Sequence, residues 1–253
     1  MNNYKQTLLE DYDFEVYLYE DYLKEVGVYY GPKKSCKKIV LPDIVNNKPV
    51  GAIVCAFDED DERSNDIEEI EFLSDEVDII SAFVGCDKLR KITIKGSLRH
   101  TSYSFYRCDL IYHKEDQIGY ININNNKYYL ASEALGDKKI IKLNPNTVTV
   151  AQEFITYSQL EELDLASVEY ISNFAFEGND LLKKIHFSKK LKHIGKNAFC
   201  YCDGLIELTF PQSIEYIGPG AFEFCNNLKK VTLPKKCKIY PDTFPEECMI
   251  IFY

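Results

Sequence analysis

Residues 217–234 read IGPGAFEFCNNLKKVTLP, and this stretch decides the fold. Its Ala-Phe dipeptide recurs along the chain, and from position 154 onward the phenylalanines lie 22, 23, 23 and 22 residues apart. These are Phe154, Phe176, Phe199, Phe222 and Phe244, which we call the anchor phenylalanines. A fixed period of this length predicts a solenoid, because a single repeat can bury its apolar side only against its neighbours.

Each repeat combines one short strand with one tight turn. In the quoted copy, Val231 and Leu233 alternate with polar residues, which predicts a strand with one buried face that Pro234 ends. The Ala-Phe-x-x-Cys segment predicts a short helical turn on the opposite side, with the phenylalanine filling the interior. Gly195 and Gly218 occupy the same place in successive copies and predict a tight bend.

The unit resembles I-G-x-x-A-F-x-x-C-x-x-L-x-x-I-x-I-P, the repeat of BspA-like, or Treponema pallidum-type, leucine-rich repeat proteins. The resemblance covers about residues 14–253. It implies an α/β solenoid, a right-handed leucine-rich repeat coil of about eight or nine turns. Short parallel strands would line its concave side, and short helical turns and extended segments its convex side. The resemblance also implies adhesion-type binding of host or matrix proteins.

The repeats suggest how the chain is organised. Residues 1–50 predict a β-rich N-terminal cap, and residues 51–253 the repeat solenoid, within a single structural domain. Residues 106–135 break the period, and Gly119–Leu130 reads as a hairpin around an Asn-rich turn.

Composition argues against several classes of partner. The chain has 253 residues, of which 45% are apolar and 28% charged, and its net charge of −10 disfavours nucleic acids and anionic membranes. No stretch approaches the roughly 20 apolar residues of a membrane helix, so membrane insertion is not expected. The start of the chain shows no apolar segment typical of a secretory signal, which favours the cytoplasm. The family resemblance instead implies the cell surface or secretion.

Four cysteines share one place in the repeat, three residues after a phenylalanine: Cys86, Cys108, Cys202 and Cys225. Cys202 and Cys225 would lie roughly 5 Å apart on adjacent coils, so a disulfide is conceivable. Nine cysteines in a chain without a visible leader favour small, buried, reduced thiols instead. Tyr157 and Asn179 replace this cysteine in two coils.

The outward residues of the strands form the first candidate surface for a partner, because acidic and basic pairs alternate over the last four coils. Either the charges pair across neighbouring coils and fix the stacking register, which we favour, or the face binds a protein. We call these residues the strand face: Glu162, Asp164, Lys184, His186, Glu207, Thr209, Lys230 and Thr232.

An aromatic column forms the second candidate surface. Tyr170, His193 and Tyr216 each lie six residues before an anchor phenylalanine, and the pattern predicts that they point outward and stack. Such a column either stabilises adjacent coils or contacts a partner.

Sequence motifs of catalysis are missing. The acidic run 58–62 has no Asp-x-Asp-x-Asp-Gly order, which predicts a solvated loop rather than a calcium site. None of the four histidines stands in a His-Glu-x-x-His motif, and there is no Gly-x-Ser-x-Gly or phosphate-binding loop. We therefore expect no enzyme activity, no catalytic residue, no cofactor and no metal.

The sequence predicts a non-catalytic protein–protein interaction module, either a monomer or a weak homo-oligomer. The alternative is a structural protein that assembles with itself through the terminal strand at 249–253, with no other ligand.

Overall fold

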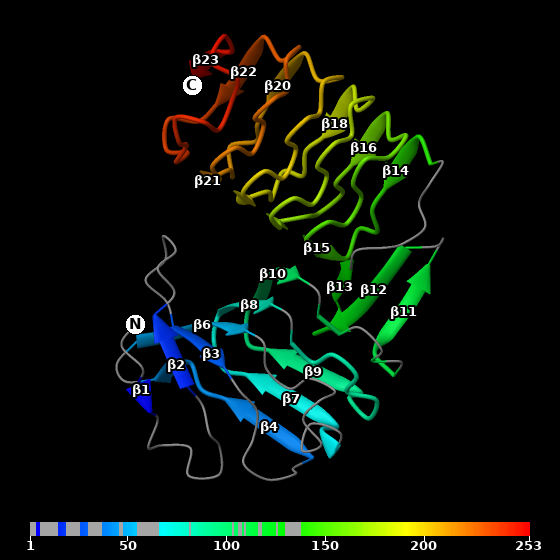
Figure 1. Cartoon of the computed structure of the whole chain (residues 1–253), viewed down its shortest axis with the longest axis vertical. Coiled ribbons are helices and arrows are strands. Elements are labelled where there is room, and N and C mark those ends of the chain that lie inside the picture. Colours follow the sequence, from blue (N-terminus) through cyan, green and yellow to red (C-terminus); the bar gives the residue numbers. More distant parts are fainter. Residues whose placement is uncertain are drawn as a thin grey trace. The chain divides into compact units, whose positions relative to one another are not determined.

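The computed structural model describes the chain in separate stretches and, from residue 138 onward, without interruption (Figure 1). The described residues are 4–5, 15–18, 26–29, 37–45, 48–54, 66–80, 82–102, 104–105, 108, 110–115, 118–124, 126–129 and 138–253. The chain forms two compact units. The first comprises Met1–His113 and Tyr120–Asn125, and the second Lys114–Gly119 and Asn126–Tyr253.

The first unit contains two sheets. The larger sheet has the order β1-β2-β3-β6-β8-β10, with β5 paired to β6. It is antiparallel up to β3 and parallel from β3 to β10. Its strands are β1 (Tyr4–Lys5), β2 (Glu15–Leu18), β3 (Val26–Tyr29), β5 (Ile44–Val45), β6 (Lys48–Val54), β8 (Glu76–Ile80) and β10 (Ser97–Ser102). The smaller sheet is parallel and consists of β4 (Lys38–Leu41), β7 (Glu69–Phe72) and β9 (Lys91–Ile94).

The second unit stacks coils whose strands lie on two sides. One side carries β13 (Asn126–Tyr129), β15 (Thr147–Val150), β17 (Tyr170–Ile171), β19 (His193–Ile194) and β21 (Tyr216–Ile217). The other carries two three-stranded sheets, namely β14 (Ile140–Lys142), β16 (Glu162–Asp164) and β18 (Lys184–His186), then β20 (Glu207–Thr209), β22 (Lys230–Leu233) and β23 (Met249–Phe252). Strands β11 (Tyr112–Glu115) and β12 (Ile118–Ile123) include residues of both units.

The anchor phenylalanines form the core of the second unit. Phe199 is fully buried and lies between Phe176 and Phe222, with ring centroids 5.0 and 5.2 Å away and ring planes within 12° of parallel. Phe222 stacks in turn on Phe244 at 5.4 Å. Each coil therefore buries its ring against the rings of its neighbours, as the period of the sequence predicts.

The predicted helical turns and α/β class were wrong. In the described parts of the chain, the fold is a parallel β-solenoid of about eight turns with almost no helix. The amides of the Ala-Phe segments donate across to the next coil: Phe176 N to Ala198 O, and Phe199 N to Ala221 O, both at 2.8 Å. An α-helix needs those amides for carbonyls four residues back, so pairing between coils displaces the helix.

Close packing of the backbone, rather than a special bend, explains the repeated glycine. Neither Gly195 nor Gly218 has a positive φ. A Cβ on Gly195 would lie 2.6 Å from the backbone N of Asn173, and one on Gly218 would lie 2.8 Å from that of Lys196. The glycine therefore lets one coil approach the previous coil, where any side chain would force the backbones apart.

Several of the features predicted for the first half of the chain stay predictions. The acidic run 58–62 and the first Ala-Phe pair lie outside the described residues. The cap at 1–50 and the single repeat domain at 51–253 are likewise untested. In the predicted hairpin region, β12 and β13 flank Asn124, which has φ 50°. Within the described stretches, no helix has the length and apolar character needed to cross a membrane.

Candidate interaction surfaces

The strand face is built by parallel strands in register. Glu162 of β16 aligns with Lys184 of β18, and Asp164 aligns with His186. In the next sheet Glu207 of β20 aligns with Lys230 of β22, and the remaining pair is Thr209 with Thr232. The central residue of each strand points inward, so its polar neighbours project outward on the same side.

Charges on the strand face pair from coil to coil. Glu162 Oε1 lies 3.2 Å from Lys184 Nζ and 2.7 Å from His186 Nε2. Glu207 Oε2 lies 3.1 Å from Lys230 Nζ. Hydrogen bonds from His186 and then Lys184 lower the pKa of Glu162. These contacts are the pairing of opposite charges between neighbouring coils that the sequence predicts.

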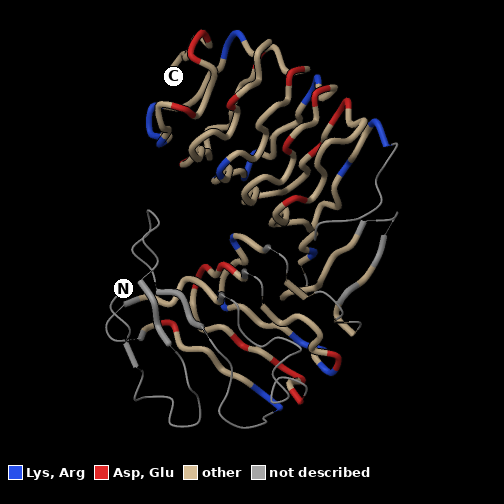
Figure 2. The backbone as a smooth tube through the Cα atoms, in the orientation of Figure 1, with Lys and Arg blue, Asp and Glu red and all other residues tan. Residues whose placement is uncertain are grey.

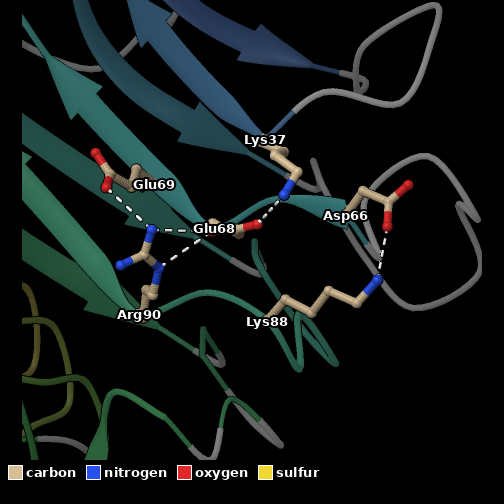
Figure 3. A network of polar contacts seen from close by, with 6 residues as sticks. All are labelled: Lys37, Asp66, Glu68, Glu69, Lys88 and Arg90. Atoms are coloured by element: carbon tan, nitrogen blue, oxygen red, sulfur yellow. Dashed lines mark hydrogen bonds and ion pairs between the residues drawn. The ribbon is translucent and has the colours of Figure 1, made fainter.

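The first unit repeats this arrangement around β7 (Figure 3). Glu68 lies between two cations, 2.8 Å from Lys37 Nζ and 2.9 Å from Arg90 Nη2. Lys88 and Asp66 pair at 2.7 Å beside them. Figure 2 shows basic and acidic positions intermixed along the described coils of both units. Pairing of opposite charges on adjacent coils is thus a property of both units.

The paired side chains nevertheless remain open to solvent. The side chains of Lys184, His186 and Glu207 are 57%, 46% and 61% exposed. Exposed ion pairs of this kind contribute only about 0–1 kcal/mol each. A partner could therefore replace them at small cost, so the pairing does not remove the strand face as a binding surface.

The rings of the aromatic column touch from coil to coil, but they meet at 71° and 44° and are not stacked as predicted, nor do all of them point outward. His193 lies between Tyr170 and Tyr216, with ring centroids 5.4 and 5.5 Å away. Tyr170 is only 1% exposed, which corrects the prediction for this residue. His193 covers one side of its ring, and Lys192 Nζ lies over the ring at 5.7 Å from the centroid. Only His193 and Tyr216 are partly accessible.

The repeated cysteines are buried hydrogen-bond donors. Cys202 Sγ donates to Phe176 O at 3.4 Å, and Cys225 Sγ donates to Phe199 O at 3.1 Å. Both are free thiols, so the conceivable disulfide is not formed. Burial raises the pKa of Cys225 to about 12 and that of Cys202 well above its usual range. Thiols of this kind are poor nucleophiles and metal ligands at neutral pH.

Asn179 takes over the role of the cysteine in its coil. Its Nδ2 donates to Ile155 O and to Phe176 O, both at 2.8 Å. Its Oδ1 accepts from Ser158 N at 3.2 Å and from Ser158 Oγ at 2.6 Å. The substitution seen in the sequence is therefore a larger polar link between two coils and not a defect of the repeat.

Two exposed aromatic residues, Tyr201 and Phe224, were not predicted as surface features. Their rings stack at 4.7 Å, and they are 44% and 45% exposed. The sequence does contain a pattern that points to them, because each lies two residues after an anchor phenylalanine in consecutive copies of the repeat. It was obscured because the coil before them carries Gly178 at that place.

No group of three or more His, Cys, Asp or Glu side chains that could hold a metal is present among the described residues. The arrangement offers stacked polar and aromatic rows on a rigid support. Rows of this kind suit recognition of another molecule.

Comparison with solved structures finds chains similar to this one. A solved leucine-rich cell surface protein from Faecalibacterium prausnitzii is 13% identical, with a TM-score of 0.51 over 100% of this chain and 95% of that protein. The pneumococcal vaccine antigen PcpA is 14% identical, with a TM-score of 0.49 over 99% and 93% of the two chains. A search of curated proteins gave no match.

The repeat itself is matched by a family model. The BspA-type leucine-rich repeat model matches residues 62–167 and 148–251, in six copies, and no enzyme family is indicated. These matches span most of the chain and cover the coils whose anchor rings, strands and thiols were described above. The chain is a member of the BspA-type leucine-rich repeat family.

Proposed function

We propose that this chain is a non-catalytic protein-binding module that uses its strand face to hold a protein partner. The observation that carries the proposal is the register of β16 with β18 and of β20 with β22, which fixes exposed charged side chains in rows. Side chains held in this way lose little conformational freedom on binding, so more of the contact energy appears as affinity.

The chemistry of the face favours selective recognition. It carries both signs of charge in a fixed order, and a partner with the complementary order would replace each pair within the face by a pair across the interface. Complementary charge of this kind sets partner choice and association rate more than raw affinity. In the aromatic column, His193 of β19 and Tyr216 of β21 are partly accessible, whereas Tyr170 is buried. These strands belong to a different sheet from the strand face, so the column would be a separate contact surface.

We further propose an adhesion-type role at a cell surface. The Faecalibacterium protein of the same fold is described as a cell surface protein, which supports this location over the cytoplasm. The family membership supports protein binding in general, and the strand face is our assignment within it.

A charge-swap variant tests the strand face without breaking the stack. Glu207→Lys combined with Lys230→Glu keeps an opposite pair at the 3.1 Å contact but inverts the order of charge on the face. We expect the partner captured by the parent protein from extracellular material or cell lysate to bind this variant at least tenfold more weakly. Titration of that captured protein by surface plasmon resonance gives the ratio.

The matched control is Asp75→Lys combined with Lys95→Asp. That pair is also exposed, at 3.0 Å, but lies in the first unit and off the strand face. It should leave the affinity unchanged within twofold. Equal binding of the parent and the Glu207/Lys230 variant would contradict the proposal.

Self-association is the second candidate function, and one observation favours it. Strand β23 ends the sheet β20-β22-β23, and Met249, Ile251 and Phe252 are 61%, 39% and 47% exposed. A sheet edge with apolar side chains is a template for another strand.

If the edge binds a second copy, the sedimentation coefficient of the parent should rise with concentration. Ile251→Lys should abolish that rise, and a parent that stays monomeric would contradict self-association.

A further inference from the structure

A second surface lies on the turn side of the second unit, and we call it the turn-edge row: Tyr157, Tyr201 and Phe224. The three side chains are 69%, 44% and 45% exposed. Their backbones follow the ladder between coils, because Tyr157 N donates to Glu177 O and Tyr201 N to Glu223 O, both at 3.0 Å.

Gly178 occupies the coil between those of Tyr157 and Tyr201. Its amide donates to Cys200 O at 2.8 Å, which places it on the rung between Tyr157 and Tyr201. Tyr157 therefore aligns with Gly178, and its predicted place at the cysteine position was wrong; Ser158 lies against Asn179 instead. The Tyr157 ring covers Gly178: a Cβ on Gly178 would lie 2.3 Å from Tyr157 Cδ1. The row therefore presents aromatic surface across four successive coils.

The backbone at this position disfavours aromatic residues. The φ angles are 47° at Tyr157, 60° at Tyr201 and 58° at Phe224, with 73° at Gly178. Only glycine adopts such angles without strain, and a bulky side chain there is a conformational outlier. Three of four coils nevertheless carry an exposed aromatic ring, which adds nothing to the buried core. Stacking of Tyr201 on Phe224 offsets part of this strain.

The charges beside the row differ from those of the strand face. Glu177 precedes Gly178, and Glu223 precedes Phe224. Among the described residues, neither carboxylate lies within ion-pair distance of a cation, whereas Glu162 and Glu207 on the strand face are both paired. Asp180 and Asp203 follow two residues after Gly178 and Tyr201. The Tyr157 hydroxyl donates a hydrogen bond to Glu177. The row is thus aromatic and flanked by negative charge.

We propose that the turn-edge row binds a basic segment of a protein, rich in Arg or Lys. The aliphatic stems of such side chains would lie across the rings, and their charged heads would reach Glu177 and Glu223. Arg and Lys combine an apolar stem with a cationic head, so they match a surface that is both aromatic and acidic. This site lies apart from the strand face and goes beyond the function proposed above.

A defined peptide tests the site without knowledge of the natural partner. The probe is a fluorescein-labelled octapeptide of alternating Arg and Gly, titrated with the full-length parent and followed by fluorescence anisotropy. Tyr201→Ala combined with Phe224→Ala should weaken binding about tenfold, because the variant loses the contact of two rings with the cationic side chains. Glu177→Gln combined with Glu223→Gln should weaken it by a similar factor.

Matched controls separate the site from diffuse charge. Glu207→Gln combined with Glu215→Gln removes the same net charge elsewhere, and Ile140→Ala combined with Ile206→Ala removes apolar side chains that are 66% and 61% exposed. Both controls, and the Glu207/Lys230 charge swap, should change affinity by less than twofold. Failure of this site is therefore distinguishable from failure of the strand face.

Three outcomes would overturn the proposal. The first is that the parent does not bind the peptide. The second is that the Glu207/Glu215 control loses as much affinity as the Glu177/Glu223 variant. The third is that the Tyr201/Phe224 variant binds as well as the parent. If the parent instead self-associates and loss of Tyr201 and Phe224 abolishes that self-association without any peptide binding, the occupant is a second copy of the chain.

Discussion

Replacing Phe199 by alanine should lower the free energy of unfolding by about 3–5 kcal/mol. The ring is fully buried and stacks on two other anchor rings, with centroids 5.0 and 5.2 Å away. Its removal leaves a cavity that the coils cannot close, because their backbones are tied together by amides such as Phe199 N, which donates to Ala221 O at 2.8 Å. Urea unfolding of the full chain, followed by circular dichroism, measures the loss.

The matched control for Phe199 is Phe224→Ala in the same unit. Phe224 also stacks on a neighbouring ring, at 4.7 Å, but it is 45% exposed. Its loss should cost no more than about 1 kcal/mol. Hydrogen exchange adds a local test, because stability in a solenoid depends on the contact between neighbours. The Phe199 variant should lose protection first in the coils that contain Phe176 and Phe222. Equal costs for the two variants would contradict the role of the anchor column.

Asn179→Ala should destabilise the protein by about 3 kcal/mol. The side chain is fully buried and makes four hydrogen bonds, which link Ile155, Ser158 and Phe176. Truncation leaves two carbonyls without that donor and Ser158 without its acceptor. An unsatisfied buried polar group costs about 1–3 kcal/mol, and the costs of neighbouring groups do not simply add. Urea unfolding again gives the magnitude.

Two further variants sharpen the Asn179 test. Asn179→Cys restores the usual residue of the repeat, and its thiol should donate to Ile155 O as Cys202 Sγ does to Phe176 O, so about half of the loss should return. Asn227→Ala removes an exposed amide that donates to Asp203 O at 2.9 Å, and it should cost less than about 0.5 kcal/mol. If Asn179→Ala lowered the free energy of unfolding no more than Asn227→Ala does, the hydrogen bonds of Asn179 between the coils would contribute nothing to stability.

Features that repeat with the period could be predicted from the sequence. The anchor phenylalanines, the alternation in β22, the buried cysteines and the complementary charges at Glu207 and Lys230 all depend on which residues share one place in successive coils. Once a solenoid is established, sharing a place in the repeat means being neighbours in space. Period and residue type therefore sufficed for the core and for the composition of the strand face.

Features that depend on the path of the backbone could not be predicted in this way. Arg99, only 1% exposed and 2.8 Å from Asp78 Oδ2, follows no repeat pattern. Nor does the sequence show that Tyr170 is covered by His193 and Lys192 while Tyr201 and Phe224 remain exposed. Burial at such places is set by the side chains of neighbouring coils and not by the residue itself.

The repeat and its core were thus determined by the sequence alone, whereas the conformation of the turns was decided only by the tertiary structure. A local interpretation of Ala-Phe-x-x-Cys predicts a helical turn, because helix formation depends on residues within one turn of each other. In the folded chain, Phe176 N and Gly178 N are each bound, at 2.8 Å, to a carbonyl of the following coil. Hydrogen bonds between stacked coils repeat at every rung and satisfy those amides, so they prevail over the local preference.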